Sequence, residues 1–99
     1  MIDIKHDHME TVKKILAEYV PECQVKAFGS RVSGKAKPFS DLDLAVDCGK
    51  RMNFDQLRLL KEAFENSDLP FRVDVVDWHG ISGGFKKTIE AKFVKVVTT

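Results

Sequence analysis

Asp41 and Asp43 stand one residue apart in an apolar segment, and this spacing is the strongest chemical signal in the chain. Side chains alternate between the two faces of a strand, so both carboxylates should project from one face while Leu42 and Leu44 point to the other. Unpaired carboxylates on an interior strand repel each other and are costly to desolvate. A divalent cation removes that cost, and Mg²⁺ prefers such hard oxygen ligands. The pair therefore predicts a metal site, and the apolar neighbours argue against the alternative, a solvated strand end.

A Gly-Ser pair, Gly29 and Ser30, follows an apolar segment, and ten residues separate it from Asp41. Glycine lets another group approach the backbone closely, and exposed N–H groups at the start of a turn favour an anion. Arg31 and Lys35 beside the turn could neutralise phosphate charge, although a solvated loop cation is an equal alternative for Lys35. A Gly-Ser pair alone is usually an ordinary turn, and only its spacing to Asp41 makes it a candidate phosphate-binding turn.

A third carboxylate, Asp74, lies between Val73 and Val75 in a later apolar segment. Alternation directs it away from the face that the two valines bury, so on a neighbouring strand it can approach the first pair. Three converging carboxylates have little structural rationale without cations. The alternative is a surface residue on an alternating strand.

The order Gly-Ser, ten residues, Asp-x-Asp resembles the signature of the DNA polymerase β-like nucleotidyltransferases. It is most similar to that of the minimal nucleotidyltransferases (MNT) that are paired with HEPN proteins. The signature covers Gly29 to Asp43, and the likeness extends more loosely through Asp74 over most of the chain. The resemblance implies a catalytic and metal-binding triad that holds Mg²⁺, with two ions expected: Asp41, Asp43 and Asp74. It also implies a set of residues that binds the phosphates of ATP: Gly29, Ser30, Arg31 and Lys35.

In this family branch the implied reaction is transfer of AMP from ATP to a tyrosine of a HEPN-type ribonuclease toxin. The chain would then be the antitoxin of the pair. Two alternatives stay open at this point. The chain could silence a partner by occlusion without catalysis, or it could be a nucleotidyltransferase for a small molecule that works as a homo-oligomer.

The composition limits the other possibilities. The 99 residues are expected to form a single domain over 1–99, too small to include a separate substrate-binding domain. A net charge of +1 does not favour nucleic acid, and no apolar run is long enough to span a membrane. The N-terminus has no signal-peptide pattern, and Cys23 and Cys48 are interpreted as reduced thiols, so the cytoplasm is the expected compartment. No role is assigned to the histidines: His6, His8 and His79.

Hydrophobic periodicity predicts an alternation of helices and strands. The expected elements are a helix with its stripe from Met9 to Val20 and a capping box at Asp7, a strand over 24–28, a helical turn over 30–33, a strand over 41–47, a helix capped by Asn53, a strand over 71–76, and a last helix from Phe85 to Phe93 with an extended tail over 94–97. The connection between the first two strands is too short for a helical crossover, so these strands should be antiparallel. The expected fold class is α+β (mixed α/β), a nucleotidyltransferase fold with a mixed sheet of three to four strands and helices packed on one face.

Overall fold

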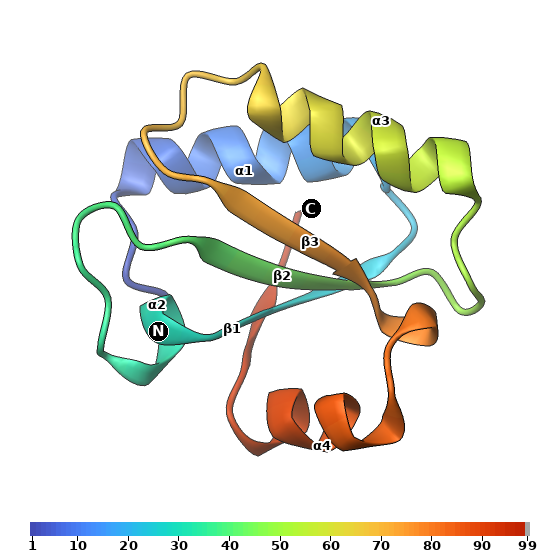
Figure 1. The fold of residues 1–99 in the computed structure, drawn as a ribbon. Coiled ribbons are helices and arrows are strands. Elements are labelled where there is room, and N and C mark those ends of the chain that lie inside the picture. Colours follow the sequence, from blue (N-terminus) through green and yellow to red (C-terminus); the bar gives the residue numbers. More distant parts are fainter. Residues whose placement is uncertain (99) are drawn as a thin grey trace.

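A four-stranded mixed sheet forms the centre of the computed structural model, which describes residues 1–98 (Figure 1). Its strand order is β3-β2-β1-β4. The strands are β1 (Gln24–Phe28), β2 (Leu42–Asp47), β3 (Val73–Asp77) and β4 (Val94–Val96). The helices are α1 (His6–Tyr19), α2 (Ser30–Ser33), α3 (Phe54–Glu65), the 3-10 turn η1 (Trp78–Gly80) and α4 (Gly83–Ala91).

The pairing of the strands follows from the lengths of their connections. β1 is antiparallel to β2, as predicted, because the segment between them contains only the short α2 and a loop. β2 and β3 are parallel, and α3 supplies the crossover between them. β4, predicted only as an extended tail, is a fourth strand that pairs antiparallel with β1. The mixed sheet expected from the sequence is confirmed.

Local sequence signals fix some helix ends and fail at others. The Asn53 side chain accepts a hydrogen bond from the Asp55 N–H, as predicted for the start of α3. The predicted capping box at Asp7 is wrong, because α1 begins at His6 with Lys5 as its N-cap and no side-chain cap. Among residues 1–98, none of the helices combines the length and the apolar character that a membrane span requires.

The hydrophobic core lies between the sheet and the pair α1 and α3, which cover the same face (Figure 1). Even-numbered β2 residues point into this core, so the odd-numbered residues of β2 point to the opposite face. The core combines apolar side chains of both helices with those of the sheet: Val12, Leu16, Leu42, Leu44, Val46, Leu60, Phe64 and Val75.

The prediction of helices on one face holds for α1 and α3, but α4 lies on the other face (Figure 1). There Phe85 of α4 packs edge-to-face on Phe28 of β1, with ring centroids 5.7 Å apart. The Lys26 ammonium lies 4.2 Å from the centroid of the Trp78 ring. α4 therefore covers part of the face that carries the carboxylates.

The two cysteines correct the expectation of reduced thiols, because Cys23 and Cys48 form a disulfide. The register of β1 and β2 explains the bridge. Gln24 lies opposite Asp47, so continuing the same register by one residue brings the cysteines face to face. Their Cα atoms are 4.3 Å apart, a separation typical of directly opposed residues on antiparallel strands. The spacing of the two cysteines in the sequence does not predict the disulfide. The predicted antiparallel pairing of the two strands indicates it once the register is known.

Reducing this bridge is expected to lower the free energy of unfolding by about 3 kcal/mol, because a cross-link removes conformational entropy from the unfolded chain. The half-cystines are 25 residues apart, so the closed loop is long enough for an effect of this size. Urea unfolding with and without a reductant measures the difference. A Cys23→Ser/Cys48→Ser variant should unfold at the reduced protein's midpoint in both conditions. Equal midpoints for oxidised and reduced wild type would contradict the expectation.

Candidate active site

Two carboxylates are directly opposed on the sheet face opposite the core, and a third lies just before them along the chain. Asp43 on β2 and Asp74 on β3 are directly opposed in the parallel register, and Asp41 lies one residue before β2 begins. The face-sharing predicted for Asp43 and Asp74 from alternation is confirmed, since the core residues Leu42 and Val75 alternate with them. The geometry thus brings the three acids that the sequence singled out to one end of adjacent strands.

The proximity of these charges alters their electrostatics. Burial of the Asp43 carboxyl raises its pKa to about 6, and the charge of Asp74 and then that of Asp41 act in the same direction. The Arg72 guanidinium acts in the opposite direction, but it is largely exposed and lies 3.9 Å from Asp74. Among residues 1–98, these carboxylates therefore have no buried cationic partner.

Such a site suits a cation that arrives with a nucleotide. Within residues 1–98, no three His, Cys, Asp or Glu side chains converge tightly enough to cage an ion by themselves. Mg²⁺ in phosphoryl-transfer sites takes one or two carboxylates and completes its shell with phosphate oxygens and water. An uncompensated carboxylate cluster without a closed cage fits that mode of binding.

Gly29 places the turn after β1 directly against Asp43. Its backbone has φ 80° and ψ −157°, a region that is essentially restricted to glycine. A Cβ atom at this position would overlap the Asp43 carboxylate oxygen Oδ2. Two separate features therefore favour glycine at this position: the backbone conformation and the close approach of the carboxylate.

Ser30 and Lys35 lie on the connection between this turn and Asp41. Ser30 begins α2, whose first turn closes through hydrogen bonds from the N–H groups of Val32 and Ser33 to the Gly29 carbonyl. Among the hydrogen bonds of the described residues, none involves the Ser30 hydroxyl, and no carboxylate forms an ion pair with Lys35. Both groups are therefore available to a ligand.

The Arg31 side chain is buried and hydrogen-bonded within the protein. Its side chain is 6% exposed, and its guanidinium donates to three backbone carbonyls. The acceptors are Ser40 O at 2.9 Å, Asp3 O at 2.9 Å and Pro38 O at 3.1 Å. The guanidinium also stacks on the Phe71 ring at 4.2 Å from its centroid. These contacts give Arg31 a structural role in holding the loop that precedes Asp41, and phosphate binding by Arg31 stays a prediction.

One further acid on the same strand face has a different environment. Asp47 accepts a hydrogen bond from the Gly49 N–H and lies 2.6 Å from His79 Nε2. Burial raises the pKa of Asp47, but the hydrogen bonds from Gly49 and His79 outweigh it and hold the pKa below its ordinary value. Asp47 is paired and outside the candidate site, and His79, to which sequence reasoning gave no role, is its partner.

Replacing Asp43 by Asn is expected to raise the unfolding temperature of the metal-free protein at pH 7. The raised pKa means that ionising this carboxyl costs more in the folded state than in the unfolded chain. This destabilisation is absent below about pH 4, where both states are protonated, and complete above about pH 6. Allowing for solvent screening of a half-buried group, we expect a gain on the order of 1 kcal/mol, or about 4–8 °C.

Thermal unfolding in EDTA at pH 7 and at pH 4 measures this effect. An Asp47→Asn variant is the matched control, because replacing the carboxylate by a neutral amide weakens the hydrogen bonds with Gly49 and His79 and should lower the unfolding temperature at pH 7. An Asp43→Asn advantage that is absent at pH 7, or equally large at pH 4, would show that charge repulsion is not its cause.

Comparisons with known proteins identify the family of the chain. The sequence pattern of the family described as "Polymerase beta, Nucleotidyltransferase" matches residues 10–98. A protein of Haemophilus influenzae named "Probable protein adenylyltransferase MntA" is 47% identical over 95 residues, which are 96% of this chain and 83% of that protein.

Solved structures share the fold at lower identity. A chain of a toxin–antitoxin crystal structure with AMP-PNP is 23% identical, with a TM-score of 0.76 over 92% of this chain and 73% of that one. A chain from a complex of a tri-AMPylated Shewanella oneidensis HEPN toxin with MNT antitoxin is 19% identical, with a TM-score of 0.62 over 96% and 74%. The family pattern, the relative and the shared fold agree, and the chain belongs to the polymerase beta nucleotidyltransferase family.

Proposed function

We propose that the chain transfers AMP from ATP to a tyrosine hydroxyl of a HEPN-domain ribonuclease and thereby acts as the antitoxin to that toxin. One observation carries the proposal, the pairing of Asp43 with Asp74 across adjacent strands beside the Gly29 turn. The relative that is 47% identical is named a protein adenylyltransferase, which supports adenylyl transfer to protein. The fold shared with the complex of an AMPylated HEPN toxin suggests the class of acceptor.

In this proposal each side chain has a defined task. Asp41, Asp43 and Asp74 hold Mg²⁺, which when bound neutralises the charge of the triphosphate. The Ser30 hydroxyl donates to a phosphate oxygen, and the Lys35 ammonium compensates charge beside it. These tasks consist of positioning and charge neutralisation, which supply most of the rate enhancement in phosphoryl-type transfers.

The bond changes balance without a further reactant. The tyrosine oxygen forms a bond to the α-phosphorus of ATP, the bond from that phosphorus to the bridging oxygen breaks, and pyrophosphate leaves. The phenolic proton passes to a carboxylate, for which Asp74 on the edge strand β3 is our assignment. Residues 1–99 act as a single catalytic domain, and the partner supplies the surface around the acceptor.

We place this reaction in the cytoplasm, where ATP and the RNA substrates of a ribonuclease are found.

Incubating the chain with MgATP and a HEPN-domain partner protein tests the proposal. The mass of the partner should increase by one or more AMP groups, and its ribonuclease activity should fall in parallel. Silencing without a mass change would instead establish occlusion. A partner that is neither modified nor silenced would favour a small-molecule acceptor.

A further inference from the structure

We propose that the acceptor protein reaches the active site over the edge strand β3, through a hollow that Asp74 shares with Arg72 and Lys61, and that its tyrosine is flanked by acidic residues. The inference rests on the proposed function, because it concerns the side from which the acceptor approaches the carboxylates. Three kinds of observation support it: the lining of the hollow, the order of the strands that carry the site, and the charges beside Asp74.

The hollow has a volume of about 550 Å³ and lies at the free edge of the sheet, between α3 and β3. Asp74 is part of its lining, so the hollow adjoins the candidate site directly. Its apolar lining consists of side chains that belong to the core or pack against it: Phe64, Leu69, Phe71, Val73 and Val75. The rest of the lining is charged: Lys61, Glu65, Arg72 and Asp74. Such a mixture of apolar and charged groups is typical of surfaces that bind another protein.

Arg72 connects this hollow to the carboxylates. The Leu42 N–H donates to the Arg72 carbonyl at 2.9 Å, which extends the parallel ladder that pairs Leu42 with Val73. Continuing the register by one residue sets Arg72 opposite Asp41, and alternation gives Arg72 and Asp74 the same sheet face. The Arg72 guanidinium lies 3.9 Å from the Asp74 carboxylate. Arg72 therefore lines the hollow and borders the site at the same time.

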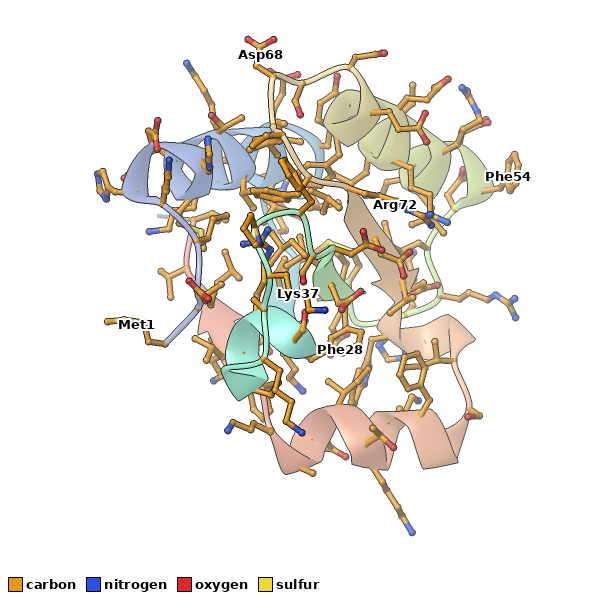
Figure 2. All side chains as sticks on the ribbon, turned by 60° about the vertical axis from the view of Figure 1, so that its left-hand side comes forward. Met1, Phe28, Lys37, Phe54, Asp68 and Arg72 are labelled. Carbon is orange, nitrogen blue, oxygen red and sulfur yellow. A yellow bond between two sulfur atoms is a disulfide. The ribbon has the colours of Figure 1, made fainter. Side chains whose placement is uncertain are left out.

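The strand order indicates the direction from which the acceptor arrives. The Gly29 turn approaches Asp43 from β1, whereas Asp74 lies on the other neighbour of β2, the edge strand β3. Phe28, the last residue of β1, and Arg72, just before β3, mark these two sides in Figure 2. In transfer at phosphorus, the attacking and leaving oxygens lie roughly in line on opposite sides of the phosphorus atom. With the leaving pyrophosphate at the Gly29 turn, the tyrosine oxygen arrives from the side of Asp74, where the hollow lies.

The charges of the lining indicate the chemistry of the acceptor. The Arg72 side chain is 73% exposed, and its distance from Asp74 is too long for a hydrogen bond. Among the described residues, no carboxylate forms an ion pair with Lys61. When Asp74 holds Mg²⁺, the lining retains two cations against one anion, Glu65. Acidic residues beside the acceptor tyrosine complement this balance, and a guanidinium binds a carboxylate through two hydrogen bonds.

The first test compares Arg72→Ala with a matched control, Arg51→Ala. Arg51 is also exposed, but it lines a different hollow, near the start of α3, of which Asp74 is not a part. Three quantities are measured with a HEPN-domain partner protein: its Kd in EDTA without ATP, and the KM values for that protein and for ATP in AMP transfer. We expect Arg72→Ala to raise the Kd and the KM for the partner by about tenfold and to keep the KM for ATP within about twofold. Arg51→Ala should stay within about twofold of wild type in all three.

Two charge reversals on α3 test the acidic character of the acceptor. Lys61→Glu should raise the Kd of the partner by about threefold to tenfold, because it removes positive charge from the lining. Glu65→Lys should lower the Kd, and both effects should shrink as the salt concentration increases. Both positions are exposed, so the unfolding temperatures should stay close to that of wild type.

Each other outcome has a defined meaning. An unchanged partner Kd in Arg72→Ala, or an equal loss in Arg51→Ala, overturns the acceptor site. A raised KM for ATP alone assigns the hollow to the base, and a change of oligomeric state on gel filtration assigns it to a second copy of the chain; either overturns the proposal. Weaker binding by both Lys61→Glu and Glu65→Lys overturns the acidic character of the acceptor. If the wild type binds the partner but transfers no AMP, the proposed function fails, while weaker binding by Arg72→Ala would still support docking at the hollow.

Discussion

An Asp43→Asn variant is expected to transfer AMP to the HEPN partner about 10²–10³-fold more slowly than wild type, the loss typical of removing one group that stabilises the transition state. The substitution keeps the size of the side chain and removes a charge that interacts with those of Asp74 and Asp41. Metal-dependent ATP binding should weaken with it, because an amide is a poorer ligand for Mg²⁺ than a carboxylate. The rate is measured as the partner's mass increase over time, and ATP affinity by calorimetry with and without Mg²⁺.

Asp47→Asn is the matched control, since Asp47 lies on the same strand and face but is paired with His79. Its rate should stay within about threefold of wild type below the unfolding temperature of both variants. The two variants should therefore show opposite patterns: Asp43→Asn is more stable and inactive, whereas Asp47→Asn is less stable and active. An Asp43→Asn variant that keeps the wild-type rate would show that the carboxylate pair is not the metal site.

Alternation along strands accounts for the part of the site that could be predicted. Period-two patterning is a local property, so it placed Asp43 and Asp74 opposite their buried neighbours before any pairing was known. The short connection between β1 and β2 likewise required antiparallel pairing. These inferences held because each depends on residues that are close in sequence.

Arg31 shows why the remaining contacts could not be predicted. Its position after Ser30 suggested phosphate, but the direction of its side chain is set by carbonyls at Asp3, Pro38 and Ser40. Those acceptors come from two separate loops, and no spacing rule connects them to a guanidinium on a four-residue helix. The burial of an arginine at a sequence motif is a tertiary property, and only the assembled fold reveals it.

The cysteines and the last strand depend on pairing in the same way. Cys23 and Cys48 become neighbours only once the register of β1 and β2 is fixed. One opposed pair, such as Gln24 and Asp47, is enough to fix that register. β4 forms because Val94 and Val96 point to the same core face as Val25 and Ala27 of β1. Its three residues carry too little pattern to distinguish a strand from a tail.

Gly29→Ala is expected to reduce both stability and AMP transfer far more than Gly34→Ala, although both glycines have positive φ, at 80° and 84°. Gly34 has the left-handed helical conformation with ψ 12°, and a Cβ added there would meet no atom within 4 Å, so alanine costs about 1–2 kcal/mol of backbone strain. At Gly29 the backbone strain is of similar size or larger, about 1–3 kcal/mol, and a methyl group must also displace the Asp43 carboxylate.

The two effects can be separated by measuring activity per folded molecule. Circular dichroism at low temperature gives the folded fraction of each variant, and the partner's mass increase gives the rate. Gly34→Ala should keep nearly the wild-type rate once corrected for folding, whereas Gly29→Ala should fall about 100-fold, as expected when a transition-state contact is lost. If both variants retain full activity per folded molecule, Gly29 is required only for the backbone conformation of the turn. A loss confined to Gly29→Ala would show that its contact with Asp43 sets the position of the catalytic carboxylate, because backbone strain is common to both variants and displacement of the carboxylate is not.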